Sequence, residues 1–271
     1  MKKDITLYPE ALAMANIVFY FSGTGNSLKV AKTVARELGG GEIVSMGKQG
    51  NYSLAKQYDT IGFIYPAYYW GLPKKVIEFI KNLNINDNKN AYYYSIATNG
   101  GSPGNAVYQL YKLLLKSHNT KLNYGQKLRM FSNYVVMYEM SEKTDEITKH
   151  SDEALVPLIA SIKNRENNRI SKSTQILGFL NSWFIKKVSV MDKHFTVNND
   201  CTGCGICKEV CPVKNITMQN NRPRYNHNCE QCVACIQFCP QKAINYRDQT
   251  QNRRRYTHPE ISYKELAENN T

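Results

Sequence analysis

The stretch Asn16-Ile-Val-Phe-Tyr-Phe21 is followed directly by Ser22-Gly-Thr-Gly-Asn-Ser27, and together these residues decide the fold. The first part is a continuous apolar run, typical of a parallel strand buried on both faces. Apolar residues then recur at helical spacing from Leu28 to Leu38, and the glycines at 39–41 end that helix. A strand, a glycine turn and a helix are the opening of a βαβ unit.

The same alternation continues to about residue 166. We expect further strands over 42–45, 59–65, 91–98 and within 127–138, and further helices over 74–83, 106–117 and 152–165. Strands that alternate with helices imply a parallel sheet covered on both faces. The prediction is an α/β domain with a five-stranded, doubly wound parallel sheet.

The turn Ser22–Ser27 joins a strand to a helix N-terminus, where backbone N–H groups and hydroxyls bind anions. The chain has no Gly-Lys-Ser/Thr here and no Gly-x-Gly-x-x-Gly, so neither a nucleoside triphosphate loop nor a dinucleotide fold is supported. A hydroxyl-rich loop without a cation suits a terminal phosphomonoester. The alternative is an ordinary strand–helix turn with a good helix cap.

This turn resembles the phosphate loop of flavodoxins, Ser/Thr-x-Thr-Gly-Asn-Ser/Thr, and the resemblance implies a flavodoxin-like fold that binds FMN. Ligands bind beyond the carboxyl ends of parallel strands, so two later strand ends are expected to hold the flavin ring. The candidate FMN-binding residues are therefore Ser22, Gly23, Thr24, Gly25, Asn26, Ser27, Pro66, Ala67, Tyr68, Tyr69, Trp70, Gly71, Thr98, Asn99, Gly100 and Gly101. For Tyr68 and Trp70 the alternative is ordinary loop packing.

All eight cysteines lie between Cys201 and Cys239, in a segment that repeats after 28 residues. Each half reads Cys-x-x-Cys-x-x-Cys-x-x-x-Cys-Pro. Iron in a cubane takes one soft thiolate per iron, three closely spaced cysteines can wrap one cube, and the fourth points to the other cube. We therefore expect two [4Fe–4S] clusters with exchanged fourth ligands, one held by Cys201, Cys204, Cys207 and Cys239 and the other by Cys229, Cys232, Cys235 and Cys211.

Structural zinc also uses paired Cys-x-x-Cys, but it does not need three cysteines in tandem followed by Cys-Pro, twice. The segment resembles the bacterial ferredoxins with two [4Fe–4S] clusters over about 50 residues. That resemblance implies a small α+β module that carries single electrons at low potential.

The remaining segments complete the predicted organisation. The whole order resembles the flavodoxin–ferredoxin fusion proteins of anaerobic bacteria. The expected parts are an N-terminal extension over 1–15 with Met14 as an alternative start, a flavodoxin-like domain over 16–166, a connector helix over 167–195 that buries Trp183 between domains, a ferredoxin-like domain over 196–247, and a tail over 248–271 that either folds back or stays loose.

The net charge of +13 is unevenly distributed: residues 1–195 carry +10, residues 196–247 carry +3, and the tail is neutral. Two cluster cores of about −2 each would turn the +3 into about −1. The basic residues form no long run, so we expect no nucleic-acid binding and instead an acidic redox partner. No stretch reaches the roughly 18 apolar residues of a membrane span, and no signal peptide is evident, so we expect a cytoplasmic protein.

The function predicted from these features is electron transfer between FMN, two [4Fe–4S] clusters and external redox partners. One alternative is a flavin-dependent reductase of a small acceptor, with donors such as Asn99 or Tyr134 near the ring. Another is a ferredoxin whose flavodoxin-like domain only docks and holds no cofactor. No catalytic residue is assigned, because the five histidines form no constellation.

Overall fold

The computed structural model describes residues 15–172, 175–268 and 270. The N-terminal extension up to residue 14, including the alternative start at Met14, lies outside the described residues. In the described parts of the chain, no helix is long and apolar enough to cross a lipid bilayer.

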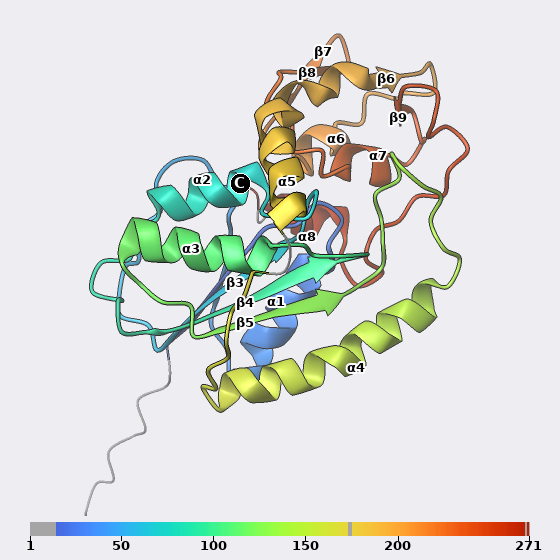
Figure 1. The fold of residues 1–271 in the computed structure, drawn as a ribbon. Coiled ribbons are helices and arrows are strands. Elements are labelled where there is room, and N and C mark those ends of the chain that lie inside the picture. Colours follow the sequence, from blue (N-terminus) through green and yellow to red (C-terminus); the bar gives the residue numbers. More distant parts are fainter. Residues whose placement is uncertain (1–14, 173–174, 269, 271) are drawn as a thin grey trace, which may run out of the picture.

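The first domain is a five-stranded parallel sheet with strand order β2-β1-β3-β4-β5. Helices α2 and α3 lie on one side of this sheet and α4 on the other (Figure 1). The elements are β1 Asn16–Tyr20, α1 Asn26–Glu37, β2 Glu42–Ser45, β3 Thr60–Pro66, α2 Lys74–Asn82, β4 Tyr92–Asn99, α3 Ala106–His118, β5 Tyr124–Arg129 and α4 Thr144–Lys163.

Alternation along β1 explains why both faces of the sheet are covered. Ile17 and Phe19 belong to the core shared with α2 and α3, while Val18 and Tyr20 belong to the core shared with α1 and α4. All four side chains are fully buried. The continuous apolar run is thus a central strand packed on both sides, as predicted for a parallel sheet.

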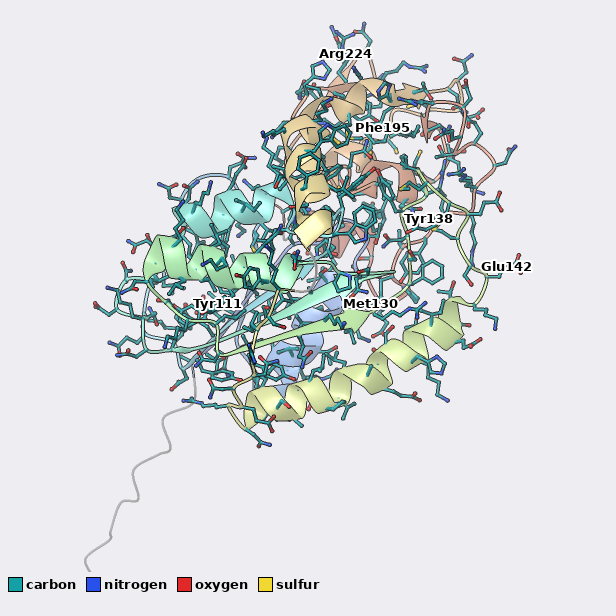
Figure 2. The ribbon with its side chains drawn as sticks, viewed as in Figure 1. Tyr111, Met130, Tyr138, Glu142, Phe195 and Arg224 are labelled. Atoms are coloured by element: carbon teal, nitrogen blue, oxygen red, sulfur yellow. The ribbon has the colours of Figure 1, made fainter. Side chains whose placement is uncertain are left out.

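Two expected boundaries were wrong. The last strand, predicted within 127–138, ends at Arg129, and the apolar residues after it pack as a loop that crosses the carboxyl end of the sheet. Figure 2 shows Tyr138 on this loop, between β5 and α4. Helix α4 begins at Thr144 rather than near 152, because Asp145 and Glu146 in its first turn favour a helix N-terminus.

The second domain follows a connector made of a helix and a 3₁₀ segment. It contains two short antiparallel pairs, β6 with β9 and β7 with β8. Its position, against the carboxyl end of the first sheet, is seen in Figure 1. The elements are α5 Gln175–Lys187, η1 Val188–His194, β6 Phe195–Val197, α6 Ile206–Glu209, β7 Ile216–Gln219, β8 Arg222–Tyr225, α7 Ala234–Gln237, β9 Ile244–Tyr246 and α8 Tyr263–Glu268.

The C-terminal tail folds back on the first domain. Ile261 and Leu266 are buried in the core that also contains α1. Lys29 of α1 pairs with Glu260, and Lys32 pairs with Glu265. The backbone N–H of Tyr256 also donates to Gln237 Oε1 of the second domain at 2.8 Å. Of the two expectations for this segment, the structure therefore adopts the docked one, and the tail contacts both domains.

Candidate functional site

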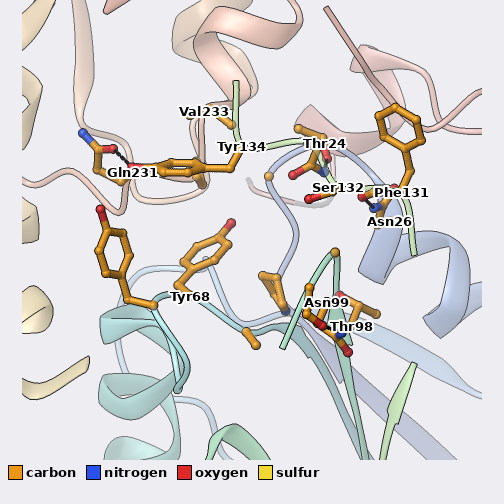
Figure 3. A pocket seen from close by; sticks show the side chains of 18 of the residues that line it. Thr24, Asn26, Tyr68, Thr98, Asn99, Phe131, Ser132, Tyr134, Gln231 and Val233 are labelled. Atoms are coloured by element: carbon orange, nitrogen blue, oxygen red, sulfur yellow. Dashed lines mark hydrogen bonds between the residues drawn. The ribbon is translucent and has the colours of Figure 1, made fainter. Parts of the chain in front are cut away.

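A cavity of about 300 Å³ lies at the carboxyl ends of β1, β3 and β4. This is the edge of a parallel sheet where ligands bind, and the volume is in the range of small-molecule sites, about 300–1,000 Å³. We call it the flavin cavity. Figure 3 shows its wall, with Thr24, Tyr68 and Asn99 from the first domain and Gln231 and Val233 from the second.

Most of the predicted FMN residues line this cavity. They are Ser22, Gly23, Thr24, Asn26, Ser27, Pro66, Ala67, Tyr68, Tyr69, Trp70, Thr98, Asn99, Gly100 and Gly101. Gly25 and Gly71 lie outside its wall. The Cα of Gly25 faces Ile261 and His258 instead, and that of Gly71 faces Asn181 and Gln109.

The Ser22–Ser27 turn is held by its own hydroxyl groups and by neighbouring strands. The backbone N–H of Gly25 donates to Ser22 Oγ at 3.1 Å. The hydroxyls of Ser27 and Thr98 are 2.9 Å apart, which ties the turn to β4. Among the described residues, no side-chain oxygen caps α1 at Gly25, whose φ is 99°. These bonds hold the turn in place, and the helix N-terminus stays open to an anion.

Aromatic side chains form the other part of the wall. Tyr69 stacks on Phe184 of α5, with ring centroids 4.0 Å apart and planes 10° apart. Burial raises the pKa of Tyr68 and of Tyr134, so both hydroxyls keep their protons. The Tyr134 hydroxyl donates to Gln231 Oε1 at 2.5 Å, a bond that crosses between the domains.

The connector helix docks through a different residue from the one predicted. Trp183 was expected to be buried between the domains, but it is 46% exposed and lies under the Lys187 ammonium. Phe184, next to it, is 1% exposed and lines the flavin cavity. The prediction was wrong because neighbouring residues of a helix point in different directions, and the apolar pattern alone favours neither.

Ten cavity residues were missed in the choice of candidates. They come from the loops after β4 and β5, from α5 and from the second domain, and they are Ser102, Phe131, Ser132, Asn133, Met137, Tyr138, Phe184, Gln231, Cys232 and Val233. Tyr134 also lines the cavity and was expected only as a donor in the reductase alternative. No local motif marks these positions, because the docking of distant segments brings them together.

The eight cysteines gather around two further cavities, four to each. One, the outer cysteine site, is lined by Cys201, Cys204, Cys207 and Cys239. The other, the inner cysteine site, is lined by Cys211, Cys229, Cys232 and Cys235. This grouping is the exchanged one, in which Cys211 and Cys239 each join the opposite half of the repeat.

Backbone N–H groups point at the sulfur atoms of both sites. They donate from Asn215 to Cys211 at 3.2 Å, from Gln231 to Cys229 at 3.2 Å and from Ala243 to Cys239 at 3.3 Å. Such bonds stabilise thiolates and tune the potential of an iron–sulfur centre. All eight cysteines are free of disulfides, and the soft donor set of each site fits a four-iron cube.

Burial alone disfavours charge on these sulfurs. It raises the pKa of Cys207 to about 12 and holds the pKa of Cys229 and Cys235 well above the ordinary value. Iron binding must therefore displace protons from these thiols. Folding of this domain and metal binding should accordingly be coupled.

The docked tail supports the phosphate-loop region from behind. The Tyr256 hydroxyl donates to Asn26 Oδ1 at 2.8 Å, and the Tyr256 ring stacks on Phe131 at 4.1 Å. The backbone N–H of His258 donates to Thr24 O at 2.8 Å. The tail thus reaches two residues of the turn that lines the flavin cavity.

Comparisons with known proteins agree with this division. Residues 17–132 match the flavodoxin domain family, and residues 187–244 match the 4Fe-4S dicluster domain family. These two domains support electron transfer through flavin and iron–sulfur centres. Among proteins with curated functions, none matches the chain.

Several solved structures are similar to the chain. A flavoprotein from Bacteroides uniformis is 21% identical, and the match covers 43% of this chain and 91% of that one at a TM-score of 0.35. A flavoprotein from Bacteroides eggerthii is 19% identical over 54% and 98% at 0.34. A Lactobacillus acidophilus flavoprotein in complex with FMN is 14% identical over 42% and 93% at 0.32.

The two domain matches together span both parts of the fold, and they follow each other in the order of the two domains. The chain is therefore a flavodoxin–ferredoxin fusion, with a flavodoxin domain followed by a 4Fe–4S dicluster ferredoxin domain.

Proposed function

We propose that this protein transfers electrons between FMN, two [4Fe–4S] clusters and external redox proteins. The observation that carries the proposal is the arrangement of the cysteines. They fall into two sets of four around separate cavities, and one of these cavities adjoins the flavin cavity. Joining the carriers in one chain gives each a high effective concentration beside the other.

In this proposal the FMN phosphate binds at the Ser22–Ser27 turn, whose N–H groups and hydroxyls suit a phosphomonoester. The ring lies among Tyr68, Tyr69 and Trp70, with the 98–101 segment along its edge. Their place in the cavity wall supports this assignment. When bound, FMN supplies one- and two-electron chemistry, and the protein orients it and restricts its contact with water.

Two clusters are proposed, one for each cysteine site. The ligands are Cys201, Cys204, Cys207 and Cys239 at the outer site and Cys211, Cys229, Cys232 and Cys235 at the inner site. The lining of the two cavities supports this pairing. A bound cluster supplies one-electron chemistry, and the exchanged fourth ligands tie the two halves of the repeat together.

We propose acidic redox proteins as partners, because residues 1–195 carry +10 of the net charge of +13. A cytoplasmic location is part of the same proposal, since cysteines arranged for metal ligation suit a reducing compartment.

A reductase that acts on a small acceptor is the second candidate. Met137 and Tyr138 line the flavin cavity and are 62% and 40% exposed, so the cavity reaches solvent there. A small acceptor could approach a bound flavin from this side. Steady-state turnover of quinones or nitro compounds faster than by free FMN would favour the reductase.

Anaerobic purification and reconstitution, followed by quantitation of FMN, iron and sulfide, tests the proposal. We expect about one FMN and about eight iron and eight sulfide per chain, from two four-iron cubes. Less than a tenth of an equivalent of FMN would contradict the flavin part and favour a cofactor-free docking domain. Zinc in place of iron would contradict the cluster part.

A further inference from the structure

The two cysteine sites differ in their relation to the flavin cavity. Cys232 and Val233 line both the flavin cavity and the inner cysteine site. Within the described chain, none of the residues around the outer cysteine site lines the flavin cavity. A single stretch of backbone therefore separates the flavin cavity from one cysteine site only.

The phosphate-loop turn touches this stretch directly. A Cβ atom added to Gly23 would lie 2.4 Å from the carbonyl oxygen of Cys232 and 3.0 Å from its Cβ. The glycine is required here because the two backbones meet without room for a side chain. Cys232 is thus in contact with the turn proposed to bind FMN and also belongs to the inner site.

The internal repeat is asymmetric at this wall. In the first half, Gly203 and Gly205 have φ values of 74° and 80°. The equivalent positions in the second half are Gln231 and Val233, which keep the left-handed backbone at 53° and 56°. This conformation is strained for a β-branched residue such as Val233. The second half of the cysteine repeat, which faces the flavin cavity, therefore tolerates a strained backbone that places these two side chains in the cavity wall.

Access from outside is also asymmetric. Cys204 of the outer site is exposed, whereas Cys211, Cys229 and Cys235 of the inner site are buried. The backbone N–H of Cys229 donates to Ser189 O of the connector at 3.1 Å, which covers the inner site from that side. An external protein can approach the outer site more closely than the inner one.

From these observations, and resting on the proposed function, we infer a fixed order of electron transfer. The Cys232–Val233 segment is the contact between the flavin and the inner cluster, and the outer cluster, at the Cys204 face, is the port for an external one-electron redox protein. Gln231 and Val233 are positioning residues that close the flavin cavity against the inner cluster.

The transfers balance one electron at a time. An external one-electron donor loses one electron and the outer cluster is reduced from the 2+ to the 1+ state. The electron then passes to the inner cluster, which reoxidises the outer one, and onward to the flavin. Two such transfers, with two protons taken from solvent, reduce one FMN fully. With an external acceptor the order is reversed.

Electron paramagnetic resonance on the reconstituted full chain tests the order. A reduced cluster speeds the relaxation of a nearby flavin radical and raises the microwave power at half saturation. Cys232→Ser and Cys204→Ser perturb the inner and the outer cluster separately. We expect Cys232→Ser to lower the half-saturation power at least fivefold, and Cys204→Ser to change it less than twofold. The opposite ranking, or equal effects, would overturn the inference.

Two alanine variants test the same inference if a cysteine-to-serine variant fails to take up its cofactors. Val233→Ala and Gly205→Ala put the same residue at equivalent left-handed positions of the two halves. A Cβ at Gly205 meets no atom of the described part of the chain within 4 Å. We expect Val233→Ala to raise the FMN dissociation constant at least threefold and Gly205→Ala to change it less than twofold. Equal changes in the FMN dissociation constant of the two variants would contradict the positioning role. A Val233→Ala variant whose melting temperature changes while its FMN dissociation constant does not would contradict it as well.

The wild-type controls separate this inference from the proposed function. A chain that holds neither FMN nor iron contradicts the proposed function itself. A chain that holds both, but whose flavin relaxation depends on the outer cluster, leaves the proposed function standing and overturns the order.

Discussion

Adding one methyl group at Gly23 should separate the two domains where they meet. The Gly23→Ala side chain would lie 2.4 Å from the Cys232 carbonyl oxygen, whereas ordinary contacts of a Cβ begin near 3.4 Å. The backbones must therefore move apart by about 1 Å. Overpacking of this kind destabilises by about 1–3 kcal/mol. The φ of Gly23 is not in the left-handed region, so the effect is steric and not conformational.

The assay compares the apparent Tm and the FMN content of reconstituted Gly23→Ala and Gly101→Ala. Gly101 lines the same cavity, but a Cβ there meets no atom within 4 Å in the residues that the structure describes. We expect a Tm lowered by several degrees for Gly23→Ala only, since about 1 kcal/mol shifts Tm by about 2–4 °C in a chain of this order of size. FMN retention by Gly23→Ala should also be weaker than that of the wild type, whereas Gly101→Ala serves as a control for Tm alone, because the 98–101 segment is itself proposed to lie along the flavin ring. Equal Tm values of the two variants, or a wild-type Tm for Gly23→Ala, would refute the proposed domain contact.

Three further outcomes follow from the same contacts. Tyr256→Phe removes one hydrogen bond to Asn26 and should weaken FMN binding about fivefold, given a net worth of about 1 kcal/mol per bond; unchanged affinity in a fluorescence titration would argue against support by the tail. Phe184 is a buried aromatic residue, so Phe184→Ala should lower the free energy of unfolding by about 3–5 kcal/mol. Trp183 is half-exposed, so Trp183→Ala should lower the urea midpoint far less, and the reverse ranking would contradict docking of α5 through Phe184. Burial lowers the pKa of His258, so the unfolded state binds more protons and stability should fall as the pH drops through about 6.5. In melting curves recorded against pH, His258→Gln should lose less stability over this range, and a loss as steep as that of the wild type would contradict the role of His258.

The strand, turn and helix at the start of the chain could be predicted because their information is local. The run Ile17–Phe21 has no polar interruption, and the turn after it has the residue types of a phosphate loop. The cysteine sets rest on local information too, since spacing within the repeat limits which sulfurs can share a cube. The structure places four cysteines around each of two cavities, and their assignment as cluster ligands stays a prediction.

What could not be predicted depends on contacts between distant segments. The loop after β5 has the apolar pattern of a strand, because Phe131, Val135 and Val136 are apolar. These side chains are buried in a core that also contains residues of the second domain, and they do not form part of the edge strand. Burial of Phe184 instead of Trp183 depends on the rotation of one helix. The sequence left open whether the tail folds back or stays loose, and Tyr256 and His258 of the tail are in fact buried against the phosphate-loop turn.

The most direct test of the account is the number of electrons that the reconstituted chain accepts. In an anaerobic reductive titration with optical and paramagnetic detection, we predict about four electrons per chain, two for FMN and one for each [4Fe–4S] cluster. Uptake of about two electrons or fewer, or the absence of either a flavin or an iron–sulfur signal, would contradict the claim that one chain joins a flavin to two clusters.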